Sequence, residues 1–145
     1  MPQIELERTV PAPLDRVYAV AKDIERFPEI MPSIKSVRIS TPGPRQVSEW
    51  VGYIAEFKRT VKWTEEDYWD DDKHRCEFRA VAGDWDRYEG VWEFAPQGES
   101  TLMRLRVGYD FNVPLIGALI QGVLAKLVRK NCEEMISGIA QRAAC

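Results

Sequence analysis

The stretch VPLIGALIQGVLAKLVRKNCEEMISGIAQR, residues 113–142, decides how the rest of the chain folds. Asn112, just before it, is a favourable N-cap residue. Pro114 falls in the first turn, where a missing N–H costs no hydrogen bond. No proline follows to interrupt the segment. The pattern predicts one helix of about 30 residues, which is long for a globular domain.

The two halves of this predicted helix differ in character. Val113–Ala125 carries no charge, and its apolar run is shorter than the roughly 20 residues that span a bilayer. The second half is amphipathic in the ordinary way. The apolar stripe rotates between the halves, so we expect the halves to pack on different partners or the helix to bend. The first half is either a buried core helix or a lid over a cavity.

The region before this helix is rich in alternating apolar and polar residues separated by short turn sequences, which is typical of an antiparallel meander. A short helix is predicted over Leu14–Lys22, and a second short helix or turn over Ile24–Pro32, where two prolines lie four residues apart. The predicted strands are Gln3–Val10, Ile34–Ser40, Gln46–Ile54, Lys58–Trp69, His74–Val81, Arg87–Ala95 and Thr101–Phe111.

Strands with one apolar face need a partner on that face, and only the C-terminal helix is large enough. We therefore predict one α+β domain over residues 1–145, in which a strongly curved antiparallel sheet of about seven strands wraps around that helix. The inward faces carry many aromatic side chains, which either fill the core or line a pocket: Trp63, Phe78, Tyr88, Trp92, Phe94, Tyr109 and Phe111. Glu65 and Asp67 share the face of Trp63, and either lie near a cavity or stay in solvent where the strand bends.

Charge and cysteine content narrow the classes of function. A net charge of −3 argues against a nucleic-acid binder whose affinity comes from neutralising phosphates. The three cysteines are widely spaced and odd in number, which favours reduced thiols over a disulfide framework. With no secretion-signal pattern at the start of the sequence, these features predict a cytoplasmic protein.

Catalytic and metal-binding motifs are not evident. His74 is the one histidine, and it lies beside the acidic turn Asp70–Asp72, where we expect a surface position. No Ser-His-Asp or Cys-His arrangement is available without it, and no Cys/His cluster has the spacing of a zinc site. We expect no hydrolase activity, no bound metal and no cofactor.

Four segments, in this order and spacing, resemble the START/Bet v 1-like superfamily and within it the polyketide cyclase/dehydrase and coenzyme Q-binding subgroup. They are Ala12-Pro13 with Val17-Tyr18, the run Asp23–Pro32, the run Gly90–Pro96, and the run Tyr109–Ile116. The resemblance covers essentially the whole chain. It implies the helix-grip fold, with an apolar cavity between the sheet and the C-terminal helix.

The resemblance also implies the expected function. The favoured hypothesis is binding or carrying of a hydrophobic small molecule, such as a lipid, quinone or polyketide. A polyketide aromatase/cyclase is the alternative, and a partner-binding protein resembling the ribosome-association toxin is a third. Transient membrane contact and the choice between monomer and homodimer stay open. The expected cavity-lining residues are Trp63, Glu65, Phe78, Tyr88, Trp92, Phe94, Leu105, Val107, Tyr109, Ile116, Ile120, Val123 and Leu127. Phe27, Ile30 and Met31 are expected to cover Val113–Ala125 and act as its gate.

Overall fold

Seven β-strands form one antiparallel sheet in a computed structural model. The structure describes residues 3–110 and 118–144, but not the side chains of residues 57 and 118–121. The strand order is β1-β7-β6-β5-β4-β3-β2. The strands are β1 (Gln3–Val10), β2 (Ile34–Thr41), β3 (Arg45–Ile54), β4 (Arg59–Asp70), β5 (Arg75–Gly83), β6 (Arg87–Gln97) and β7 (Ser100–Asp110). The helices are α1 (Leu14–Lys22), the 3₁₀ segments η1 (Ile24–Glu29) and η2 (Ala55–Phe57), and α2 (Ala118–Ala144).

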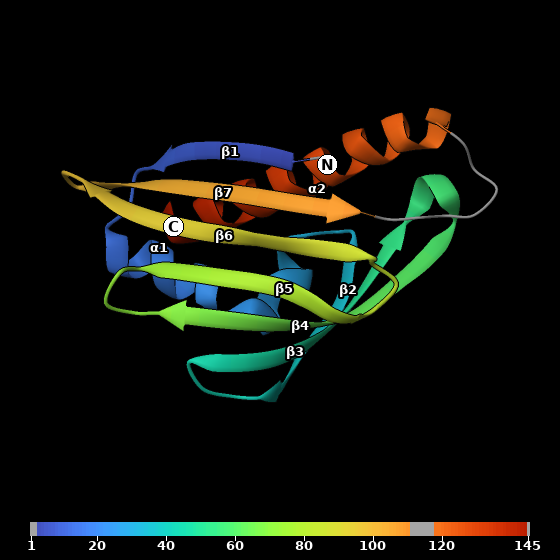
Figure 1. Ribbon diagram of the computed structural model, residues 1–145. Coiled ribbons are helices and arrows are strands. Elements are labelled where there is room, and N and C mark those ends of the chain that lie inside the picture. Colours follow the sequence, from blue (N-terminus) through green and yellow to red (C-terminus); the bar gives the residue numbers. More distant parts are fainter. Residues whose placement is uncertain (1–2, 111–117, 145) are drawn as a thin grey trace.

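The sheet curves, and α2 lies along its inner face (Figure 1). The side chains that α2 buries recur every three or four residues, as expected for a helix with one covered stripe. They are Leu124, Val128, Cys132, Met135, Ile136, Ile139, Ala140 and Ala143. The helix-grip architecture predicted from the sequence is therefore confirmed, and none of the described helices is long and apolar enough to cross a membrane. The predicted helix start at Asn112 lies outside the described residues.

Strand alternation decides which side chains face α2. On β4, Val61, Trp63, Glu65, Asp67 and Trp69 are all buried, whereas the residues between them are exposed or half-buried. Successive side chains of a strand point to opposite faces, so one inward residue fixes the rest. The strand does not bend away after Trp63, and Glu65 and Asp67 are inside the molecule.

Two strands begin one residue later than the sequence pattern predicts. Lys58 and His74 adopt left-handed backbone conformations, with φ of 48° and 51°, and so belong to the turns that precede β4 and β5. His74 is also less exposed than expected for a surface residue. Its ring packs edge-on against Tyr18 with 4.9 Å between the centroids.

The segment η1 packs against the C-terminal half of α2. Ile30, just after η1, lies so close to Gly138 that a Cβ added there would come within 2.7 Å of the Ile30 Cβ. Glu29 accepts a hydrogen bond from Arg142 at 2.9 Å. Gly138 thus permits this close approach. Residues 113–117 of the uncharged half, which this segment was expected to cover, lie outside the described residues.

The two described glycines of α2 provide a matched pair of substitutions. Gly122→Ala should raise the free energy of unfolding by up to about 1 kcal/mol, because alanine is the better helix former and its Cβ meets nothing within 4 Å. Gly138→Ala should lower it by about 1–3 kcal/mol, because the new Cβ overlaps Ile30. Urea denaturation of both variants measures the difference. Equal stability of the two variants would contradict the packing described here.

Candidate functional site

Two adjacent chambers lie between the inner face of the sheet and α2. The outer chamber, about 110 Å³, is bounded by Gly52, Val61 and Trp85 on the sheet side and by Leu124, Leu127 and Val128 on the helix side. The inner chamber, about 40 Å³, lies deeper, next to η1 and to the middle of β4. Ile34, Trp63 and Asn131 line both chambers.

Aromatic rings form most of the wall of the inner chamber. Trp50 and Trp63 are paired across β3 and β4, and their rings stack with centroids 5.6 Å apart. Phe27 meets the Trp50 ring edge-on at 5.7 Å. On the other side of Trp63, Tyr88 lies 5.8 Å away and itself stacks on Trp85 at 5.0 Å. These rings provide a large apolar surface that is fixed by ring-to-ring packing.

A pair of buried carboxyl groups lies in this aromatic wall. Glu65 and Asp67 are only 5% and 3% exposed. Asp67 Oδ2 accepts hydrogen bonds from Ser48 Oγ at 2.8 Å and from Gln46 Nε2 at 3.4 Å. The Ser48 hydroxyl in turn accepts one from Trp50 Nε1 at 2.9 Å. The β3–β4 register explains this arrangement, because Gln46 is paired with Asp67 and Ser48 with Glu65.

Glu65 holds a proton more tightly than an ordinary glutamate does. Burial raises the pKa of Glu65 well above its usual range, and the charge of Asp67 and a hydrogen bond with it raise this pKa further. The hydrogen bond that Trp63 Nε1 donates to Glu65 Oε1, at 3.2 Å, acts in the opposite direction on the same pKa but is outweighed.

Several of the predicted lining residues do surround the chambers. Glu65, Phe78, Tyr88 and Trp92 line the inner chamber, Leu127 lines the outer one, and Trp63 lines both. Of the predicted gate, Phe27 and Met31 line the inner chamber, whereas Ile30 packs on Gly138 instead. Ile116 lies outside the described residues, as does the side chain of Ile120.

Other predicted lining residues lie elsewhere. Val123 is 41% exposed and faces away from the chambers. The uncharged half of the helix is apolar on every side, so its sequence could not indicate which side faces the sheet. Phe94, Leu105, Val107 and Tyr109 are buried core residues that border neither chamber. They belong to β6 and β7 and are enclosed by their neighbours.

Sequence reasoning missed several residues of the site, among them Gln46, Ser48, Trp50 and Trp69. The first three alternate along β3 and are buried, but two polar residues on one face resemble a solvent-facing strand. The register with β4 identifies their role, and a single sequence does not contain that register. Trp85, between β5 and β6, lines the outer chamber.

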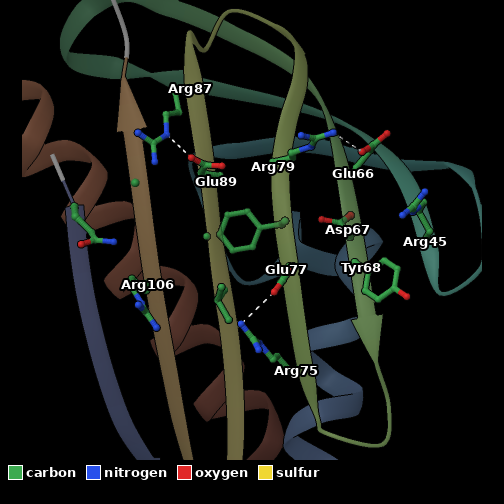
Figure 2. A pocket seen from close by; sticks show the side chains of 15 residues that line it. Arg45, Glu66, Asp67, Tyr68, Arg75, Glu77, Arg79, Arg87, Glu89 and Arg106 are labelled. Carbon is green, nitrogen blue, oxygen red and sulfur yellow. Dashed lines mark hydrogen bonds and ion pairs between the residues drawn. The ribbon is translucent and has the colours of Figure 1, made fainter. Parts of the chain in front are cut away.

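A depression of about 720 Å³ lies on the opposite, outer face of the sheet. Charged side chains make up most of its wall, with nine charged residues among the 15 that line it. Figure 2 shows three ion pairs among them: Arg75 with Glu77, Arg79 with Glu66, and Arg87 with Glu89. Such exposed pairs are well solvated and contribute little binding energy. This surface suits a hydrophobic molecule less well than the two chambers do.

Among the described residues no group of His, Cys, Asp or Glu is arranged to hold a metal ion. The basic residues that would contact a macromolecular partner, Lys58, Arg59, Lys62, Lys126, Arg129 and Lys130, are all exposed. No described feature indicates which partner they would bind, and the partner-binding hypothesis stays a prediction.

The fold and the chambers agree with comparisons to known proteins. The sequence profile of the family described as "Polyketide cyclase / dehydrase and lipid transport" matches residues 10–136. The chain belongs to this family. The crystal structure of TTHA0849 from Thermus thermophilus is similar over 98% of this chain and 97% of that one, with 36% identity and a TM-score of 0.91. No curated protein matches the sequence.

Two further solved structures share the fold at lower identity. The Zhui aromatase/cyclase from Streptomyces sp. R1128 has 20% identity and a TM-score of 0.89, covering 98% of this chain and 93% of that one. A START superfamily protein from Mycobacterium smegmatis has 18% identity and a TM-score of 0.81, covering 97% and 96%. At these identities the two structures show that the fold of this polyketide cyclase/dehydrase family member is shared, as its sequence predicted.

The protonation of Glu65 has a consequence for stability that can be measured. The folded protein holds this proton more tightly than the unfolded chain does, so the free energy of unfolding falls as pH rises above the ordinary glutamate value, by up to about 1.4 kcal/mol per pH unit. Glu65→Gln removes this term. The stability of the variant relative to the native protein should therefore increase between about pH 5 and pH 8.

Denaturant titrations across this pH range provide the measurement. Glu66→Gln is the matched control, because Glu66 is on the same strand but faces outward, where it pairs with Arg79 at 3.4 Å. Its relative stability should not change with pH in this range. If the Glu65→Gln and native curves run parallel, Glu65 is already ionised in the folded protein.

Proposed function

We propose that this polyketide cyclase/dehydrase family member binds a hydrophobic small molecule in the two chambers between the sheet and α2. One observation carries the proposal: two adjacent chambers are walled by aromatic and aliphatic side chains, with a small polar group at the inner end. Apolar burial supplies the binding energy, at about 25 cal/mol for each Å² removed from water. A few polar contacts then fix the orientation of the molecule.

The size of the chambers bears on how a ligand enters. At about 110 and 40 Å³, they are smaller than most ligand sites, which enclose roughly 300–1,000 Å³. A segment that lines the chambers therefore has to move before a ligand of ordinary size can enter. The segment from η1 to Met31 is the best candidate, because Phe27 and Met31 line the inner chamber and only short turn hydrogen bonds hold the backbone there.

Dye binding with a chamber-filling variant tests the proposal. The neutral dye N-phenylnaphthylamine should bind saturably with one site per chain, as measured by the rise in its fluorescence. Leu127→Phe should weaken binding about tenfold or more, because the larger side chain occupies the outer chamber. Val123→Phe, an equally enlarged residue on the exposed side of α2, should leave affinity unchanged. Absence of saturable binding, or equal loss in both variants, would count against the proposal.

Hydrogen exchange tests the proposed movement of the cover. The amides of Ile30 and Met31, which both bond to the Phe27 carbonyl at 3.0 and 2.9 Å, should exchange quickly in the free protein and slow when the dye is bound. Leu105, in the centre of the sheet between β1 and β6, should exchange slowly in both states. Slow exchange of Ile30 and Met31 without dye, unchanged on adding it, would show that this segment is static.

An aromatase/cyclase activity is the second candidate, and the carboxyl pair favours it. Two carboxyl groups side by side, of which Glu65 has a raised pKa, can donate and accept a proton during an aldol-type ring closure. Conversion of a linear poly-β-ketone into a cyclised product, lost on Asp67→Asn, would support this activity over simple carriage. Binding of the same compound without conversion would support carriage.

A further inference from the structure

The inner chamber contains two buried carboxyl groups, those of Glu65 and Asp67. None of the described residues that line this chamber is basic. Burial raises the pKa of Tyr88 and Cys76 and raises that of Cys132 to about 12, so these other titratable residues of the wall are neutral. A carboxylate enclosed without a basic neighbour lowers stability, and it attracts any cation that can reach it.

Trp69 marks the same chamber as incomplete without an occupant. Its side chain is 5% exposed and lies two residues beyond Asp67 on the inward face of β4. The indole N–H is buried and makes no hydrogen bond to any described atom. Buried donors are nearly always paired, so this one requires an acceptor from a bound molecule or water.

The aromatic wall suits a cation as well. The stacked rings of Trp50 and Trp63 border the inner chamber beside the carboxyl pair. The face of an indole ring attracts an ammonium group, and this attraction is strongest where water is excluded. The carboxyl pair and the ring faces therefore favour the same kind of group, whereas a carboxylate or phosphate head would be repelled.

We propose that the inner chamber binds the head of an apolar amino alcohol, with the protonated amine against Glu65 and Asp67 and the hydroxyl oxygen accepting the Trp69 N–H. The apolar body occupies the outer chamber, which shares the lining residues Ile34, Trp63 and Asn131 with the inner one. This inference rests on the proposed small-molecule function and specifies its ligand class. The inference argues against fatty acids as ligands, because their carboxylate head group is negatively charged.

Competition against N-phenylnaphthylamine by ligands that share a naphthyl body tests the head-group preference. At pH 7, naphthylethylamine should displace the dye at a concentration about tenfold or more below that of naphthylethanol, and naphthylacetate should be weakest. Naphthylethanolamine, which adds the hydroxyl, should bind tightest. If the dye binds but the acid or the neutral alcohol competes as well as the amine, the charge inference is wrong while the proposed function stands. If no dye binds, the proposed function itself fails.

Three variants separate the contributions. Asp67→Asn and Glu65→Gln each remove one carboxyl group that contacts the amine, and each should reduce the preference for amine over alcohol. Glu66→Gln, on the outward face of the same strand, is the matched control and should keep the preference. Trp69→Phe should remove only the advantage of the amino alcohol over the amine. A preference that either carboxyl variant leaves unchanged, or an amino alcohol advantage that survives Trp69→Phe, would overturn the corresponding contact. If a variant fails to fold, the ranking of head groups on the native protein still tests whether the inner chamber prefers an amine.

Discussion

The structure depends on one constraint: a curved seven-stranded sheet has an apolar inner face, and a single helix has to cover it. A helix is a cylinder about 10 Å across, whereas the sheet is much wider, so side chains must fill the space on both sides of α2. Aromatic residues do this on β3, β4 and β6, and α1 with η1 closes one end. The chambers are the volume that remains, and they lie beside the strands that carry the largest rings.

The same constraint explains why the carboxyl pair is tolerated. Glu65 and Asp67 occupy positions on β4 that strand alternation assigns to the interior, so the polar groups of β3 opposite them must supply hydrogen bonds. Ser48 and Gln46 do so, and Trp50 completes the chain of donors. Replacing a supporting donor would leave a buried acceptor unpaired, which costs about 1–3 kcal/mol. We regard β3 as the strand that makes the polar end of the chamber feasible.

The architecture could be predicted because strands and helices leave recognisable patterns among residues that are close together in the sequence. Two-residue alternation located all seven strands, and the proline-free apolar run located α2. The same alternation put Glu65 on the face of Trp63, but it left open whether the strand bends away before Glu65. Two features were not local: the side of α2 that faces the sheet, and the pairing of β3 with β4. Val123 was therefore placed inside although it is exposed, and Ser48 was overlooked although it bonds to Asp67.

The pairing of β1 with β7 has a consequence for how the molecule is made. Ile4 lies opposite Val107, so the first strand of the sheet to be synthesised pairs with the last. Neighbouring strands from β2 to β7 pair through short connections and can form early, whereas β1 must wait until the whole sheet is available. Contacts between such distant segments slow folding, because the loop that joins them must first be closed. On the ribosome, β1 remains without its partner longer than any other described strand, and it is the segment most exposed to mispairing during synthesis.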